Sequence, residues 1–593
     1  MSTSAWATHA LQAFDNVVAA QAHLRPRAGQ REMAAQVAHT FAHAHLGKPT
    51  EGEDSPPNTA VAPSIAVIQA GTGVGKSLAY SAPAIAMALQ RGTRVVISTA
   101  TVALQEQLVH KDLPTLAAQM PQPFAFALAK GRGRYVCKLK LERLLSGVGE
   151  DDDVVPDDLL AAEAAEQRLV RRSVAAQGER AQFYASLAQS LASSQWDGDR
   201  DQLPTPPEPE LWASVAADAH TCTNKHCPLF AQCSYFERRK ELVAAQVIVA
   251  NHDLLLSSLG ARLLPELDNC LLILDEAHHL PSTALAQFGC EMDITRLAWI
   301  DKLASRALRI GQLVEVEDIA DVPQHAARLR THLQELARLV LALYAQPLRS
   351  DETPPLPGAR PSAAPRWGAG QPSRARVAEG QLPSELVEPL AQAAHHAGGF
   401  LEVLRAIAKA LRTQLRDKPD DARRLSQLYA QAGALAPRLE AVHACTQLLL
   451  QDTPAGGVPA AKWFTLAHEG DSRVLRAHAN PVLPGNALRQ HLWSGARAAV
   501  LTSATLTSCG QFDFFLRESG LYGDADLTTL EVPSPFDYAR QGQLVVRETA
   551  ADPREAEAYT RDMVQALLAD LAQVRSTVGS LTPASCARAA MLE

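Results

Sequence analysis

The sequence predicts an α/β protein built on a parallel sheet that carries inserted domains. Three observations predict this class. Short apolar segments with β-branched residues alternate with alanine-rich helical segments over much of the chain. One apolar segment, Ile65–Ile68, is followed by a glycine-rich turn and a helical segment over residues 78–90. Another, Cys270–Leu274, ends in the acidic pair Asp275 and Glu276.

The glycine-rich turn has the pattern of a phosphate-binding loop, with alanine in place of its first glycine. Glycines let backbone N–H groups point at phosphate oxygens, and the following helix adds partial positive charge. We expect Lys76 to reach the β- and γ-phosphates of a nucleotide and Ser77 to bind Mg²⁺. A glycine turn without a ligand is the alternative, but the Lys-Ser ending argues against it. The expected nucleotide-binding residues in this loop are Gly71, Thr72, Gly73, Gly75, Lys76 and Ser77.

A helical region over residues 9–45 precedes the first strand and contains Arg27 and Gln30. A glutamine amide can donate and accept at the edge of an adenine, although most surface glutamines have no such role. Residues 46–63 are proline-rich and predict a loop.

Three further strands are predicted downstream of the loop. Residues 93–99 form the first, which ends in the hydroxyl-rich segment 98–101. Such residues suit contacts to a nucleic-acid backbone or simple helix capping. Residues 246–250 lead to Asn251 and His252, and residues 270–274 lead to the acidic pair. There Asp275 is expected to hold Mg²⁺ and Glu276 to orient and deprotonate the attacking water.

Composition limits the possible classes. A length of 593 residues indicates about three to five domains. The net charge of −8 argues against a uniformly basic nucleic-acid coat, so any DNA binding must use a local patch. The first sixteen residues lack a signal-peptide pattern, and no apolar run approaches the ~20 residues that span a bilayer. We therefore expect a cytoplasmic protein without a membrane partner, whose nine cysteines are metal ligands or free thiols.

Four cysteines form a candidate metal site. Cys137 stands alone, whereas Cys222, Cys227 and Cys233 fall within twelve positions. Four thiolates suit a [4Fe–4S] cluster or a tetrahedral zinc ion. Zinc sites usually contain short paired spacings, so these wider spacings favour iron–sulfur. The other cysteines, at 270, 290, 445, 509 and 586, predict buried or free thiols.

Basic and aromatic residues flank these cysteines and are candidates for DNA contacts. A metal site would bring the two basic runs together, which favours DNA contact slightly over the alternative of a solvated charged face. The candidates are Lys130, Arg132, Arg134, Tyr135, Lys138, Arg238 and Arg239.

The remaining regions are helical, with one further strand. Residues 286–460 contain apolar stripes at helical spacing, interrupted by a proline- and arginine-rich segment, 346–383, that we expect to be disordered. Residues 498–501 are a fifth strand, ending in Ser503-Ala504-Thr505.

The motifs together resemble the XPD-like iron–sulfur branch of superfamily 2 helicases. Residues 70–77, 275–278 and 503–505 resemble its motifs I, II and III, and residues 27–30 resemble its adenine-sensing glutamine motif. The resemblance implies a RecA-like motor fold, ATP, Mg²⁺, a [4Fe–4S] cluster on the four cysteines and a helical Arch domain. It also implies 5′ to 3′ unwinding of forked or overhang duplexes from single-stranded DNA. It assigns catalysis to Lys76, Asp275, Glu276 and His278, and coupling to Ser503 and Thr505.

The expected domains follow from these motifs. The first motor domain comprises residues 1–117, 246–285 and 461–515. The cluster domain comprises 118–245, the Arch 286–460, and an incomplete second motor domain 516–593. In that last region we expect a strand at 543–547, an amphipathic helix around Met563, and a tail from 576 that does not continue the family pattern. Two alternatives stay open: a remnant that binds ATP and DNA without turnover, and a zinc-containing phosphate-loop ATPase with another substrate.

Overall fold

The computed structural model describes most of the 593-residue chain. The described residues are 2–20, 27–47, 63–146, 178–259, 263–349, 373–452, 458–469, 472–524, 526–541, 546 and 548–577. The chain divides into two compact units, Met1–Pro533 and Ser534–Glu593. The expected tail from residue 578 onward and Cys586 lie outside the described residues.

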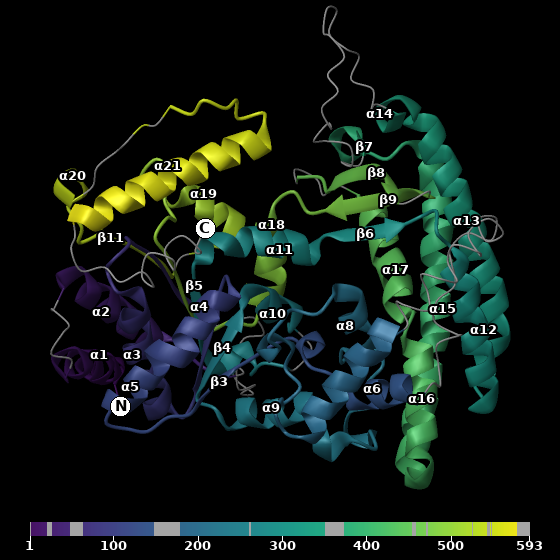
Figure 1. Ribbon diagram of the computed structural model, residues 1–593, viewed down its shortest axis with the longest axis horizontal. Coiled ribbons are helices and arrows are strands. Elements are labelled where there is room, and N and C mark those ends of the chain that lie inside the picture. The colour runs from purple at the N-terminus through teal and green to yellow at the C-terminus, as the bar shows by residue number, and fades with distance from the viewer. Residues whose placement is uncertain are drawn as a thin grey trace, which may run out of the picture. The chain divides into compact units, whose positions relative to one another are not determined.

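A seven-stranded sheet, parallel throughout, forms the centre of the first unit, which confirms the predicted fold class (Figure 1). Its strand order is β11-β1-β10-β5-β2-β4-β3. The five strands predicted between residues 65 and 501 are all present, because each is an apolar run long enough to be buried on both faces. The strands are β1 (Ser64–Ala70), β2 (Arg94–Thr99), β3 (Phe126–Leu128), β4 (Val247–Asn251), β5 (Cys270–Asp275), β10 (Ala498–Ser503) and β11 (Leu527–Val532).

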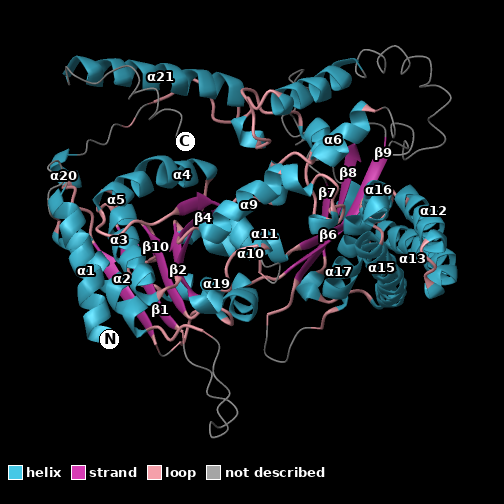
Figure 2. Ribbon diagram, turned by 90° about the horizontal axis from the view of Figure 1, so that it is seen from below, coloured by secondary structure: helices cyan, strands magenta, loops and turns pink. Residues whose placement is uncertain are grey.

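Helices cover both faces of this sheet (Figure 2). Alternate residues of β1 enter the two cores: Ala66 and Ile68 pack on one side, Ile65 and Val67 on the other. The first side is covered by α1 (Thr3–Ala20), α2 (Ala28–His43), α3 (Lys76–Arg91) and α5 (Leu113–Gln119). The second is covered by α10 (His252–Ser257), α11 (Leu280–Phe288), α18 (Pro484–Leu488) and α19 (Asp513–Ser519). The short helix α4 (Val102–Gln107) and the π-helical turn η1 (Leu108–Asp112) connect β2 to α5.

The expected helical insertion is present and shares its core with a second sheet that the sequence did not predict. Phe464, Leu475 and Ala477 of that sheet pack among the helices. The helices are α12 (Ala298–Leu313), α13 (Val322–Leu343), α14 (Ala345–Arg349), α15 (Ser384–Asp417), α16 (Ala422–Gly433) and α17 (Ala436–Leu450). The antiparallel sheet has the order β6-β9-β8-β7 and comprises β6 (Cys290–Asp293), β7 (Ser373–Arg376), β8 (Ala461–Glu469) and β9 (Ser472–Asn480).

This sheet changes two expectations. Residues 461–480, which were expected in the motor domain, form β8 and β9 of the insertion, because their apolar faces complete its core. The segment 346–383, expected to be disordered, contains β7, which pairs with β8, and a short helical turn, Ala378–Gly380. Residues 350–372 of that segment lie outside the described part.

The region expected to carry the cluster is built from short elements. Its small core contains Val136, Leu141, Trp196, Trp212 and Val215. Isolated bridges join Tyr135 to Asp199 and Val136 to Ala216. Its helices include α6 (Lys138–Leu145), α8 (Pro209–Val215) and α9 (Ser234–Ala244). Few apolar contacts hold this region, so polar contacts carry more of its organisation.

The second motor domain was expected from residue 516, yet β11 lies beside β1 in the first sheet. The boundary between the two units therefore lies after Pro533 and not at residue 516. The second unit, taken by itself, contains α20 (Tyr538–Gln541) and the predicted amphipathic helix α21 (Ala556–Thr577). The predicted strand at 543–547 falls almost wholly outside the described residues. Among the described helices, none is both long enough and apolar enough to cross a membrane.

Candidate active site

The loop between β1 and α3 has the backbone that phosphate binding requires. Gly73 and Gly75 adopt left-handed φ angles of 82° and 88°, which glycine tolerates without steric cost. A Cβ on Gly75 would lie 2.3 Å from Nε2 of Gln30, so the close approach also demands glycine. Because α3 begins at Lys76, its free N–H groups and its positive dipole end face the loop.

The two residues of the glutamine motif hold this loop from the side of α2. Nε2 of Gln30 donates a hydrogen bond to the carbonyl oxygen of Gly75 (3.0 Å). Nη1 of Arg27 donates to the carbonyl oxygen of Gly73. The loop conformation is therefore tied to the start of α2.

The acidic pair at the end of β5 meets the lysine of the loop. Nζ of Lys76 lies 3.1 Å from Oε1 of Glu276, and the hydroxyl of Tyr80 donates to Oδ2 of Asp275 (3.0 Å). Burial raises the pKa of Asp275 to about 6, and the neighbouring Glu276 carboxylate adds to the rise. Burial would also raise the pKa of Glu276, but the Lys76 cation, the Ser503 hydrogen bond and His278 together outweigh burial and lower it. The two carboxyl groups are adjacent in sequence, yet Asp275 binds a proton more tightly than Glu276 does.

A hydrogen-bonded chain links this pair to β10. Oγ of Ser503 donates to Oε2 of Glu276 (3.0 Å), and Nδ1 of His278 lies 2.7 Å from the same hydroxyl. Burial lowers the pKa of His278, which favours the neutral ring at this contact. Thr505, the other expected coupling residue, is exposed.

The sequence analysis missed three residues beside the site: Tyr80, Asp112 and Gln69. Tyr80 and Asp112 of η1 both hydrogen-bond to the hydroxyl of the predicted residue Ser77. Oε1 of Gln69 accepts from the backbone N–H groups of Leu506 (2.6 Å) and Thr507 (2.7 Å). A polar residue inside the apolar strand β1 was the signal that could have indicated Gln69.

The hydroxyl-rich segment after β2 serves helix capping and a buried contact. Oγ1 of Thr101 accepts from the N–H of Leu104 at the start of α4 (3.3 Å). Oγ of Ser98 lies 2.7 Å from Nδ1 of His252, which is buried. Burial lowers the pKa of His252 to about 4, so this imidazole is neutral at pH 7.

The four candidate ligand cysteines line one small cavity, together with the rings of Phe230, Tyr235 and Phe236. Burial raises the pKa of Cys227 to about 11, and the other three cysteines, at 137, 222 and 233, add to the rise. All four are free thiols. Among the described residues, no three or more His, Cys, Asp or Glu side chains converge closely enough to hold a single metal ion.

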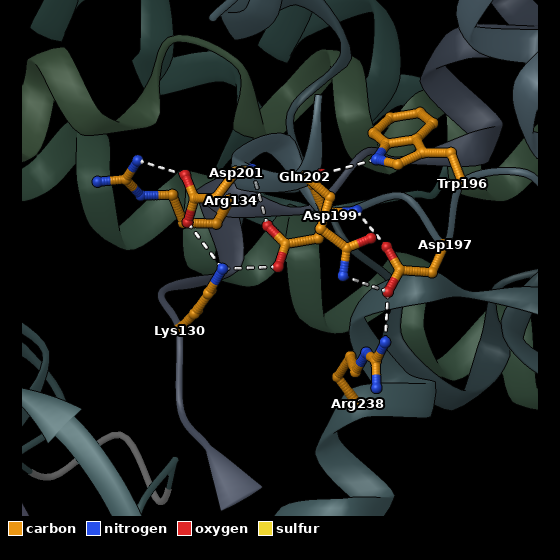
Figure 3. Close-up of polar contacts among 8 residues, drawn as sticks. All are labelled: Lys130, Arg134, Trp196, Asp197, Asp199, Asp201, Gln202 and Arg238. Atoms are coloured by element: carbon orange, nitrogen blue, oxygen red, sulfur yellow. Dashed lines mark hydrogen bonds and ion pairs between the residues drawn. The ribbon is translucent and has the colours of Figure 1, made fainter. Parts of the chain in front are cut away.

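The expected DNA-binding residues are largely engaged inside the protein (Figure 3). Lys130 pairs with Asp199 and Asp201, and Arg134 pairs with Asp201. Arg238 pairs with Asp197 and Glu241. Tyr135 is only 4% exposed, so it is not presented for base stacking. The guanidinium of Arg132 lies 4.5 Å from the ring centre of Tyr235, Arg239 contacts the Tyr235 hydroxyl (3.5 Å), and Lys138 is half-buried.

Comparison with known proteins identifies the family. The DEAD_2 family model matches residues 216–297, a stretch that includes three of the four cysteines and the acidic pair. The ATP-dependent DNA helicase DinG of Photobacterium profundum is 30% identical over 565 residues, which is 94% of this chain and 73% of that protein. The chain belongs to the DinG family.

Other DinG proteins show the same relationship. DinG of Shigella flexneri is 31% identical over 540 residues, covering 89% of this chain and 68% of its own length. DinG of Escherichia coli K12 is 30% identical with the same coverage. A solved XPD helicase structure aligns over 86% of this chain and 62% of its own, with 12% identity and a TM-score of 0.36.

Proposed function

We propose that this chain is an ATP-dependent DNA helicase whose ATP hydrolysis requires Mg²⁺ and is stimulated by DNA. The observation that carries the proposal is the contact of Lys76, on the glycine loop, with Glu276, at the end of β5. It brings a phosphate-binding cation and a candidate general base together at the carboxyl edge of a parallel sheet, where such sheets bind ligands. Membership of a family whose members are named ATP-dependent DNA helicases supports the same reaction.

The residues would divide the work as follows. Backbone N–H groups of the loop and Lys76 would hold the β- and γ-phosphates, while Gln30 and Arg27 would lie on the adenine side. Ser77 and Asp275 would hold Mg²⁺, which neutralises phosphate charge when bound. Glu276 would orient and deprotonate the attacking water. His278, Ser503 and Thr505 would couple the phosphate state to β10 and the DNA, a role that the Ser503–Glu276 hydrogen bond supports.

We also propose that Cys137, Cys222, Cys227 and Cys233 hold a [4Fe–4S] cluster. Their wide sequence spacing favours a cluster over zinc, and their shared cavity supports binding of one group by all four thiols. The cluster would link segments that lie far apart in the sequence.

For DNA, we propose binding to single strands and to forked or overhang duplexes, with 5′ to 3′ polarity, in the cytoplasm. Among the seven expected residues, Lys138, Arg132 and Arg239 are the better candidates for phosphate contacts. Lys130, Arg134 and Arg238 form ion pairs within the protein, which indicates that their main role is to stabilise the fold.

One experiment tests the nucleotide part of the proposal. ATP binding and single-turnover hydrolysis would be measured with and without single-stranded DNA. Hydrolysis stimulated by DNA supports the helicase, whereas ATP and DNA binding without turnover supports a binding remnant. Indifference to DNA in both binding and hydrolysis would point to an ATPase with another substrate.

A second experiment tests the cluster. Anaerobically purified protein should be brown and contain iron and acid-labile sulfide, and Cys222→Ser should lose both. Cys509→Ser is the matched control, because Cys509 is exposed and lies outside the cavity. Stoichiometric zinc without sulfide would contradict the proposal.

A further inference from the structure

The segment Asp197–Asp201 contains no cysteine, yet it contacts the chain on both sides of the proposed cluster site. We call residues 197–201 the aspartate loop. Its carboxylates bind cations from two separate cysteine-bearing segments (Figure 3). One segment, residues 130–137, ends in Cys137; the other, residues 233–241, begins with Cys233.

The contacts to the first segment are ion pairs. Nζ of Lys130 lies 2.7 Å from Oδ2 of Asp199 and 2.9 Å from Oδ2 of Asp201. Nη1 of Arg134 lies 3.0 Å from Oδ1 of Asp201. Asp199 is only 5% exposed, and a buried carboxylate is stable only when it is paired and hydrogen-bonded.

The contacts to the second segment come from the first residue of the loop. Oδ2 of Asp197 accepts from Nη2 of Arg238 on α9, and from Nε2 of Gln202 at 3.0 Å. The pKa of Asp197 is lowered, because the Arg238 hydrogen bond and nearby backbone N–H outweigh the effect of burial, which alone would raise it.

The loop backbone touches the direct neighbours of two cysteines. Gly198 accepts a hydrogen bond from the N–H of Val136 (2.9 Å). Its φ of 97° is left-handed, and a Cβ there would lie 2.3 Å from Oγ of Ser234 and 3.0 Å from Cγ1 of Val136. Val136 precedes Cys137, and Ser234 follows Cys233. Only glycine fits between these two residues without displacing one of them.

Hydrogen bonds within the loop and from Trp196 also stabilise the conformation of the loop. Oδ1 of Asp197 accepts from the N–H of Asp199 (2.9 Å), and Oδ1 of Asp199 accepts from the N–H of Asp201 (3.0 Å). Nε1 of the buried Trp196 donates to the carbonyl oxygen of Asp199 (2.6 Å). These bonds orient the carboxylates of Asp197 and Asp199 toward their partners.

From this geometry we infer that the aspartate loop positions Cys137 and Cys233 relative to each other, so that the chain presents a preformed thiol cavity to the cluster. Asp197, Gly198, Asp199 and Asp201 are thus positioning residues, and they act through Val136, Ser234, Lys130, Arg134 and Arg238. The inference rests on the proposed [4Fe–4S] cluster for its purpose, but the positioning itself is a property of the cluster-free chain. It also gives the ion pairs of Lys130, Arg134 and Arg238 a structural role.

The test measures alkylation of individual cysteines by iodoacetamide in cluster-free, full-length protein, with mass spectrometry to resolve each site. Asp199→Asn keeps the side-chain shape but leaves Lys130 with a weakened partner. We expect the alkylation rates of Cys137 and Cys233 to rise about tenfold, as local opening becomes easier, with a smaller rise at Cys222 and Cys227. Cys270, buried in β5 of the motor sheet, reports global unfolding and should stay unreactive.

Glu210→Gln is the charge-matched control, since Glu210 is exposed on α8 of the same region, and it should change nothing. Gly198→Ala should act like Asp199→Asn without any change in charge. If Asp199→Asn exposes Cys270 too, the milder Asp201→Asn replaces it. Unchanged rates at Cys137 and Cys233 in both Asp201→Asn and Gly198→Ala would overturn the inference.

A parallel measurement separates this inference from the cluster proposal. In reconstituted protein, iron loss to a chelator should be about tenfold faster in Asp199→Asn than in Glu210→Gln, because cluster release follows local opening. Wild-type protein that never binds iron, but shows the alkylation pattern above, would refute the cluster and leave the positioning role intact. A normal cluster with an unchanged alkylation pattern would refute the positioning role alone.

Discussion

At the scale of single residues, Lys76 is the group on which the site depends. Its ammonium is within 3.1 Å of Glu276, so the candidate base and the phosphate-binding cation neutralise each other. An arriving γ-phosphate would draw Lys76 away. Oε2 of Glu276 would then keep its contacts with the Ser503 hydroxyl and the His278 ring, and Oε1 would be free to orient water. Phosphate binding and activation of the base are in this way linked through one ion pair.

This link predicts opposite effects for two substitutions. Glu276→Gln should lower single-turnover hydrolysis by about 10²- to 10⁴-fold, while ATP affinity stays the same or rises, because Lys76 loses its competing anion. Lys76→Ala should weaken ATP binding by about tenfold or more, since a charged hydrogen bond is lost. Calorimetric ATP binding and quenched-flow hydrolysis measure both, with the exposed Glu317→Gln as control. Unaltered ATP affinity in Lys76→Ala would refute the loop assignment.

At the scale of elements, α15 is shaped to receive histidines from its neighbours. Gly398 and Gly399 lie within this continuous 34-residue helix, although each costs about 1 kcal/mol relative to alanine. A Cβ on Gly399 would lie 2.4 Å from the His325 ring of α13, and one on Gly398 would lie 3.1 Å from the His443 ring of α17. The glycines let three helices pack closely. Nδ1 of His325 then lies 3.2 Å from Nδ1 of His396, so at least one of these two rings must be neutral.

The pair predicts that the helical insertion loses folding stability at acidic pH. Burial lowers the pKa of His396, and His325, His395, His332 and Arg328 lower it further. The folded chain therefore binds fewer protons here than the unfolded chain, and its stability falls as pH drops below the usual histidine pKa of about 6.5. Thermal unfolding measured at about pH 7.5 and about pH 5.5 should show a smaller loss in His396→Gln than in wild type. The exposed His468→Gln is the control; equal losses in all three proteins would contradict the prediction.

At the scale of the whole molecule, all proposed catalytic groups belong to the unit Met1–Pro533. In phosphoryl-transfer enzymes, an arginine supplied in cis or by a partner can stabilise the charge of the transferred phosphate. The described part of the second unit contributes two helices, α20 and α21. Met563 and Leu567 of α21 are each 51% exposed, so this helix presents an apolar face to solvent.

We expect these 593 residues to bind ATP and single-stranded DNA, with a DNA affinity that falls steeply as salt rises, because phosphate contacts dominate it. Binding of a labelled single strand would be measured at about 50 mM and about 200 mM salt, with and without ATP. A DNA affinity that does not change with salt would contradict the expectation.

Much of the motor sheet could be predicted because its strands are continuous apolar runs. β11 could not, since it lies at the sheet edge and alternates exposed threonine and glutamate with half-buried leucine. The second sheet was missed because Phe464 and Ala477 sit among Arg, His and Thr residues that point to the other face.

The phosphate loop and the acidic pair could be predicted from the sequence because their residues are close together along the chain. The loop needs glycine at left-handed positions, and the acidic pair directly follows an apolar strand. The ion pairs of Lys130 were not, because its partner Asp199 is 69 positions away and only the folded loop brings them together.

The position of Val532 has a mechanical consequence. Its carbonyl oxygen accepts from the N–H of Gly71 in the phosphate loop (3.0 Å), and its side chain fills the space above Gly29 on α2. The chain leaves the first unit at the very next residue, Pro533. Tension on the segment after Pro533 would therefore act on β11 and, through this hydrogen bond, on Gly71. We expect such tension to shorten the time that a nucleotide stays on the phosphate loop.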